Sequence, residues 1–135
     1  MCVIYYARKK ATLLERAALA EAASRNADGV GAMWIDGGEI RVVRALKSSD
    51  YPDIIKALPD DGPLALHFRY GTSGGVRMEN VHPFVAHGGA VALVHNGVVS
   101  GWGEGARSDT RHIVEDVLAH VAPAALPSVV GTMFK

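Results

Sequence analysis

Cys2 is the residue of this chain best suited to chemistry, because it is the only cysteine and becomes the N-terminal residue if Met1 is removed. A terminal cysteine carries a thiol and a free α-amine that ordinarily titrate within about one pH unit of each other, so the amine can accept the thiol proton near neutral pH. The apolar run VIYY at 3–6 predicts a strand that would hold this end in a sheet. The structural alternative is a small, buried cysteine at the start of that strand.

Two downstream segments have the pattern of buried strands that end in binding loops. The first is HFRYGTSGG at 67–75, which continues to NVHPF at 80–84, and the second is LVHNGVV at 93–99. In each, an apolar run changes abruptly to polar residues and glycines, which is typical of a sheet edge that leads into a functional loop. These two loops are therefore the candidate partners of the cysteine.

The order of these features resembles that of the class II glutamine amidotransferases, a family of N-terminal nucleophile hydrolases. Along the chain they are Cys2, an H-x-R-x-x-T-x-G block, N-x-H-P, H-N-G and the SDT sequence at 108–110. None of the short motifs is specific alone, and the resemblance rests on their joint order behind an N-terminal cysteine. It extends from Cys2 to about Val121.

The resemblance implies a catalytic role for three residues. Cys2 would attack the side-chain amide of glutamine, form a glutamyl thioester and release ammonia, with its own α-amine carrying the proton. Asn96 and Gly97 match the family's oxyanion hole, in which a side-chain amide and a backbone N–H face the oxygen that becomes negative. The separate structural reading of Asn96-Gly97 is a two-residue hairpin turn.

Four further residues are implied to bind the substrate. Arg69 would hold the α-carboxylate, which suits the planar fork of a guanidinium, and Asp109 would hold the α-ammonium. Thr72 would assist through its hydroxyl, and His82 would support the site loop. The structural alternatives are a surface arginine at 69, a helix-start carboxylate at 109 and a loop histidine at 82 bonded to backbone groups.

The fold implied by the resemblance is α+β, a four-layer αββα sandwich, with residues 1–135 forming a single glutaminase-like domain. The family's domain is usually longer, so we expect the sandwich to be incomplete at the C-terminus, with a strand just beginning at 129–135 and an unpaired sheet edge. Two positions depart from the family pattern: Val3 follows the nucleophile where glycine is common, and Ser73 stands where a histidine is usual.

The elements that must position these residues follow from periodicity and turn residues. Strands are predicted at 2–7, 30–35, 39–45, 63–68, near 83–86 and at 90–95. Helices are predicted at 12–25, 49–58 and 108–121, the first opened by a capping box of Thr12 and Glu15. This order favours α+β packing over a doubly wound parallel sheet.

Composition limits the partners. Fourteen basic and fourteen acidic residues give a net charge of zero, so nucleic-acid binding is not expected. No apolar run is long enough to span a bilayer and no signal peptide is evident, so no membrane association is expected either. A single cysteine permits no internal disulfide, which favours the reducing cytoplasm.

We expect neither a metal ion nor a cofactor. His112, Asp116 and His120 are spaced four residues apart, as metal ligands on one helix face would be, but they lack a fourth ligand. The glycines at 71–75 lack the spacing of a phosphate-binding P-loop.

The sequence therefore predicts the glutaminase half-reaction of an amidotransferase, with a separate synthase subunit as a candidate ammonia acceptor. Two alternatives stay open. One is a stand-alone hydrolase of another γ-glutamyl amide, and the other is a non-catalytic, truncated remnant that acts as a binding or regulatory module.

Overall fold

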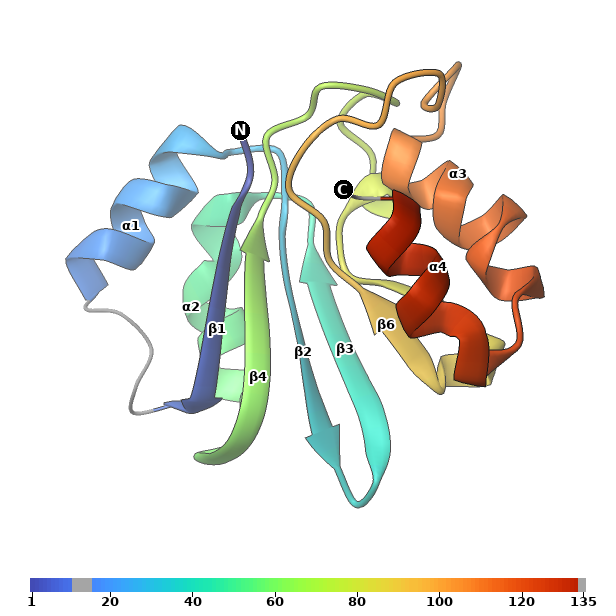
Figure 1. Cartoon of the computed structure of the whole chain (residues 1–135). Helices are drawn as coiled ribbons and strands as arrows, with labels where there is room; N and C mark the ends of the chain where they lie inside the picture. Colours follow the sequence, from blue (N-terminus) through green and yellow to red (C-terminus); the bar gives the residue numbers. More distant parts are fainter. Residues whose placement is uncertain (11–15, 134–135) are drawn as a thin grey trace.

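The computed structural model describes residues 1–10 and 16–133, which form two antiparallel sheets and four α-helices (Figure 1). The strands are β1 (Val3–Lys9), β2 (Val30–Asp36), β3 (Glu39–Ala45), β4 (Asp61–Phe68), β5 (Phe84–Ala86) and β6 (Val91–Leu93). The helices are α1 (Arg16–Arg25), α2 (Tyr51–Ala57), α3 (Asp109–Asp116) and α4 (Leu126–Met133). Short 3₁₀ turns connect several of them.

The larger sheet has the strand order β1-β4-β2-β3, and every pairing in it is antiparallel. Its register pairs Phe68 at the end of β4 with Val3 on one side and with Val30 on the other. Cys2 therefore lies next to the residues that leave β4. In Figure 1 the N-terminus lies at the same end of the sheet as this loop and the loop that leads to α3.

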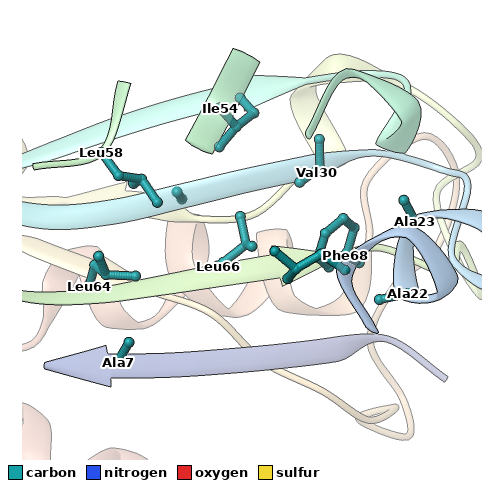
Figure 2. Close-up of a cluster of buried hydrophobic side chains, with 11 residues drawn as sticks. Ala7, Ala22, Ala23, Val30, Ile54, Leu58, Leu64, Leu66 and Phe68 are labelled. Atoms are coloured by element: carbon teal, nitrogen blue, oxygen red, sulfur yellow. The ribbon is translucent and has the colours of Figure 1, made fainter. Parts of the chain in front are cut away.

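Helices α1 and α2 cover one face of the larger sheet (Figure 2). Side chains alternate along β4, so Leu64, Leu66 and Phe68 pack against these helices while Ala65 and His67 face the other way. All five are buried, which shows that β4 is covered on both faces. The core on the helical side comprises Ala7, Leu19, Ala22, Ala23, Val30, Ala32, Ile54, Leu58, Leu64, Leu66 and Phe68.

The smaller sheet, β5 paired with β6, carries α3 and α4. Its core comprises Phe84, Ala86, Ile113, Val114, Leu118 and Leu126. The two sheets face each other, because Ala92 of β6 lines an apolar cavity with Met33 and Ala65 of the larger sheet. Gly31 of β2 lies close to the segment that leads into β5: a Cβ there would lie 2.0 Å from the carbonyl oxygen of His82. The layers thus run helices, sheet, sheet, helices, which is compatible with the predicted α+β class.

Most predicted elements are present with small changes at their ends. The hairpin of β2 and β3, strands β1 and β4 and the short helix α2 are confirmed. Strand β6 is shorter than predicted, and the last predicted helix divides into α3 and a 3₁₀ turn, Leu118–His120. Thr12 and Glu15, the predicted capping box, lie outside the described residues.

The strand predicted at 129–135 is wrong, because residues up to Met133 belong to helix α4. Pro127 occupies the first turn of that helix, where its missing N–H has no intrahelical partner to lose. Leu126, Val129, Val130 and Met133 are spaced for one helix face, and all four pack into the core of the smaller sheet. Burial of this face outweighs the β propensity of the valines. None of the described helices has the length and apolar character that a membrane crossing requires.

Candidate active site

The backbone that follows β4 holds Cys2 in place at one end of the larger sheet. The Tyr70 N–H donates to the Cys2 Sγ at 3.3 Å, and the thiol contacts the Tyr70 carbonyl oxygen at 3.6 Å. The cysteine is only partly buried. A partly exposed thiol fixed by a strand end can react with a molecule bound between the loops, which the alternative of a buried core cysteine does not allow.

Arg69 is buried, with 2% of its surface exposed, so the alternative of an ordinary surface arginine is wrong. Its Nη2 donates to the Ser73 carbonyl oxygen at 2.9 Å, while its Nη1 has no hydrogen-bond partner within the described part of the chain. Burial lowers the pKa of Arg69, and the nearby Asp28, Cys2 and Asp109 act to raise it. A buried guanidinium with an unused donor is suited to an anionic ligand.

Asp109 opens helix α3 directly after Ser108, whose side chain caps the helix by accepting from the Arg111 N–H at 3.3 Å. The carboxylate of Asp109 accepts from the backbone N–H of Val99 at 2.8 Å and of Thr110 at 2.7 Å. These bonds confirm a structural role at the helix start. They also fix the direction of the carboxylate, and its residue borders the same cavity as Arg69.

One small cavity joins six of the seven predicted site residues. Its lining comprises Cys2, Arg69, Tyr70, Thr72, Ser73, His82, His95, Gly97, Ser108, Asp109 and Thr110. The missing residue is Asn96, whose side chain is exposed. The cavity volume is about 10 Å³, roughly room for one water molecule. This closed cavity has less room than a bound amino acid needs, so part of its lining must move for one to bind.

Gly97 has a φ of +150°, a conformation that other residues adopt rarely. The next regular element after Gly97 is helix α3, so Asn96-Gly97 does not join two strands of a hairpin. A Cβ at Gly97 would also approach the His95 Nε2 to 3.1 Å. Gly97 therefore lies in a loop beside the cavity, and the alternative of a two-residue hairpin turn at Asn96-Gly97 is wrong.

His82 stacks on His67, with 4.1 Å between ring centroids, and meets the ring of Phe84 at 4.5 Å. Neither ring nitrogen of His82 has a hydrogen-bond partner within the residues described, so packing holds this ring and the alternative of backbone bonding is wrong. His67 Nε2 contacts the His95 carbonyl oxygen at 3.3 Å. Burial lowers the pKa of His67 to about 4 and that of His82 well below its ordinary value.

The stacked histidines predict that the protein loses stability in acid. The unfolded chain binds a proton at His67 near pH 6.5, whereas the folded chain binds it near pH 4. Stability present above pH 6.5 is therefore lost as the pH falls through 4, by about 3 kcal/mol for His67 alone, with His82 adding to the loss. Denaturant unfolding between about pH 8 and about pH 4 measures this change.

The matched comparison is His82→Leu against His120→Gln, since His120 is exposed. Removing the buried histidine should flatten the acid limb of the stability curve, and replacing the exposed one should not. Parallel curves for wild type and His82→Leu would show that His82 does not contribute to the loss of stability in acid.

Three residues beside the cavity had no role assigned from the sequence. Ser73 accepts from the Asp109 N–H through its hydroxyl at 3.2 Å. Asp28 accepts from the Gly71 N–H at 2.8 Å, and its own N–H donates to the Arg69 carbonyl oxygen at 3.1 Å. Asn80 is fully buried. Ser73 and Asn80 lie within the sequence motifs, so the motifs could have pointed to them as site residues. Asp28 lies in a loop whose sequence indicates only a turn.

The metal site considered on one helix face is not formed by His112, Asp116 and His120. Helix α3 ends at Asp116, and His120 lies in the following 3₁₀ turn. The Asp116 carboxylate already pairs with Arg107 at 2.8 Å. Among the described residues, no group of three or more His, Cys, Asp or Glu side chains is placed to hold a metal ion.

Three proteins are similar to part of this chain. Two are from Xylella fastidiosa: strain Temecula1 matches at 35% identity over 82 residues, covering 58% of this chain and 13% of the relative, and strain 9a5c at 37% over 79 residues, covering 56% and 12%. One from Corynebacterium glutamicum matches at 34% over 85 residues, covering 59% and 14%. All three are named glutamine–fructose-6-phosphate aminotransferases.

The similarity supports a relation to glutamine-utilising aminotransferases over little more than half of this chain. The chain spans about one eighth of the length of these relatives. No protein-family model matches it, and no solved structure does.

Proposed function

We propose that residues 1–135 form a glutaminase-like domain of the class II glutamine amidotransferase type, with Cys2 as its nucleophile. The observation that carries this proposal is the single cavity at which β1 delivers Cys2, β4 delivers Arg69 and α3 delivers Asp109. These three residues are far apart in sequence. A thiol, a buried cation and a carboxylate at one cavity match the reacting group and the two charges of free glutamine.

Recognition would use the unpartnered donor of Arg69 and the carboxylate of Asp109. Arg69 Nη1 has no partner among the described residues, and a carboxylate could accept from it in a charge-assisted hydrogen bond. The Asp109 carboxylate accepts two backbone bonds, at 2.8 and 2.7 Å, and has longer contacts of 3.5 and 3.4 Å with the hydroxyls of Ser73 and Thr110. A carboxylate has about four lone-pair sites, so it can also accept from the substrate α-ammonium.

The reaction would begin once Cys2 is the first residue. Its thiol proton passes to its α-amine, and the sulfur bonds to the amide carbon of glutamine. The carbon–nitrogen bond then breaks, the leaving nitrogen takes the proton, and ammonia departs from a glutamyl thioester. Water hydrolyses the thioester to glutamate and restores the thiol. The Gly97 N–H, with Asn96 turned inward, would stabilise the negative oxygen in both steps.

The layer order supports an N-terminal nucleophile hydrolase sandwich. Helices α1 and α2, the four-stranded sheet, the two-stranded sheet and helices α3 and α4 follow one another as the family's αββα arrangement does. The second sheet has two strands among the described residues. We propose a cytoplasmic location, and an ammonia acceptor on a separate synthase domain or subunit.

A non-catalytic binding module remains the second candidate, because the closed cavity of about 10 Å³ is too small for glutamine. A stand-alone γ-glutamyl amide hydrolase would use Arg69 and Asp109 in the same way, and differs only in the group that leaves. Comparing ammonia release from glutamine with cleavage of other γ-glutamyl amides separates the two enzymes. A cavity that stays closed would leave both reactions undetectable.

The experiment that tests the proposal uses 6-diazo-5-oxo-norleucine, which keeps the two charges of glutamine and reacts with a thiolate with loss of dinitrogen. We expect one label per chain, on Cys2, and ammonia release from glutamine that Cys2→Ala abolishes. Positioning should drive the labelling, so excess glutamine should block it and Asp109→Asn should slow it.

The matched control is Asp116→Asn, a carboxylate on the same helix that pairs with Arg107 away from the cavity. It should label at the wild-type rate. Labelling of Cys2 by generic thiol reagents but never by the analogue would leave a thiol without a glutamine site, and the binding-module candidate would replace the enzyme.

A further inference from the structure

Asn80 lies at the junction of the two loops that carry the candidate site, and it is fully buried. Its side-chain Nδ2 donates to the carbonyl oxygens of Gly74 at 2.7 Å and Ala106 at 2.9 Å. Its Oδ1 accepts from the Ser108 N–H at 3.0 Å. Both donor hydrogens and the acceptor are thus used, and the three partners come from two separate segments of chain.

These contacts connect the two charged groups of the site through short steps. On one side, Gly74 follows Ser73, whose carbonyl oxygen accepts from Arg69 at 2.9 Å. On the other side, Ser108 caps helix α3 and precedes Asp109. Asn80 joins the two sides, because one amide group bonds to Gly74 and to Ser108.

The two loops are also packed closely at this junction. Gly74 has a φ of +69°, and a Cβ there would lie 2.5 Å from the Ser108 nitrogen and 2.7 Å from the Asn80 Nδ2. Little space remains for the loop and the helix start to move relative to each other while the amide is in place. Ser73 also links the two groups, because its carbonyl oxygen accepts from Arg69 and its hydroxyl accepts from the Asp109 N–H. The Asn80 side chain holds the segments on either side of this link together.

We propose that Asn80 is a positioning residue that sets the spacing between the Arg69 and Asp109 groups, and so the fit of the two charges of an α-amino acid. This inference rests on the proposed glutaminase function. Asn80 touches neither charge and acts through Gly74 and Ser108, which are the chain neighbours of Ser73 and Asp109. Its replacement should therefore change substrate affinity and leave the reactivity of the Cys2 thiol unaltered.

The first test measures steady-state ammonia release by chains that begin at Cys2. Asn80→Ala should raise KM for glutamine roughly tenfold, with kcat within about twofold of wild type. Asn26→Ala is the matched control, because Asn26 is also buried and donates to the Ala22 carbonyl oxygen at 3.0 Å, on the helix covering the far face of the sheet. Both variants should lower Tm, but only the first should raise KM.

A double variant distinguishes positioning from general damage. In Asp109→Asn the carboxylate that would bind the α-ammonium is gone, so its distance from Arg69 no longer affects affinity. Adding Asn80→Ala to this variant should therefore raise KM by less than about twofold further. If the two effects on KM multiply, or if Asn26→Ala raises KM as much as Asn80→Ala, the positioning role is rejected.

Asn80→Asp carries the test if the alanine variant does not fold. An ionised aspartate would still accept from Ser108 but would face two carbonyl oxygens, so KM should rise. Protonation restores one donor, and the ratio of its KM to that of wild type should fall as the pH is lowered. A ratio that stays constant with pH overturns the inference. Absence of turnover in wild type would reject the proposed function itself, whereas turnover with an unchanged KM in these variants rejects the Asn80 role alone.

Discussion

A chain that keeps a residue ahead of Cys2 is expected to lose glutamine hydrolysis by roughly 10²–10⁴-fold, the usual contribution of a general base. The α-amine then lies one residue further from the thiol, and the amide nitrogen that replaces it cannot accept a proton. Met1 is 88% exposed, so its removal requires no unfolding of β1. Intact-mass measurement beside an ammonia assay relates the processed fraction to activity.

The matched control is a chain with one glycine ahead of Cys2, compared with a chain that begins at Cys2. Both keep the same thiol and a terminal amine, so a difference in ammonia release between them reports the position of the amine. Equal rates of ammonia release from the two would rule out the α-amine as the base and direct attention to His95, which borders the same cavity.

Asn96→Ala is expected to lower kcat by roughly 10²–10³-fold, the usual loss for one oxyanion donor, with little change in KM. The Asn96 side chain is exposed in this structure and does not line the cavity. It would therefore contribute only after the loop closes over a bound substrate. Steady-state kinetics of ammonia release measure the split between kcat and KM.

Val98→Ala is the control for this loop, because Val98 is 65% exposed and lies two residues away. It should leave kcat unchanged. Wild-type kcat in Asn96→Ala would mean that this side chain does not reach the reacting oxygen, and the Gly97 N–H would remain the only donor proposed for it.

The sheet could be predicted from the sequence because its determinants are local. Alternation of apolar residues and the Asp36-Gly37-Gly38 turn specify the hairpin of β2 and β3, and the run after Cys2 specifies β1. Helix α4 could not be predicted in this way. Valines at 129 and 130 favour a strand locally. The helix forms because its apolar face packs into the core of the smaller sheet, which the local sequence does not reveal.

That six of the candidate residues line one cavity could be predicted because each belongs to a motif with a proposed chemical purpose. The supporting residues could not, because they act through hydrogen bonds that exist only after distant segments meet. Asp28 reaches Gly71 across 43 residues of chain, and Asn80 reaches Ala106 across 26. The small volume of the cavity could not be predicted from the sequence either, because it depends on how two loops pack together.

Gly31 of β2 lies outside every motif, yet its missing side chain allows a close approach between the larger sheet and the segment before β5. A methyl group there would overlap the His82 carbonyl oxygen at 2.0 Å, well inside any van der Waals contact. Cys2 and Arg69 directly adjoin strands β1 and β4 of one sheet, and Asp109 begins a helix that packs on the other sheet. With only a hydrogen atom at its α-carbon, this glycine lets the two layers that carry Cys2 and Asp109 approach each other closely.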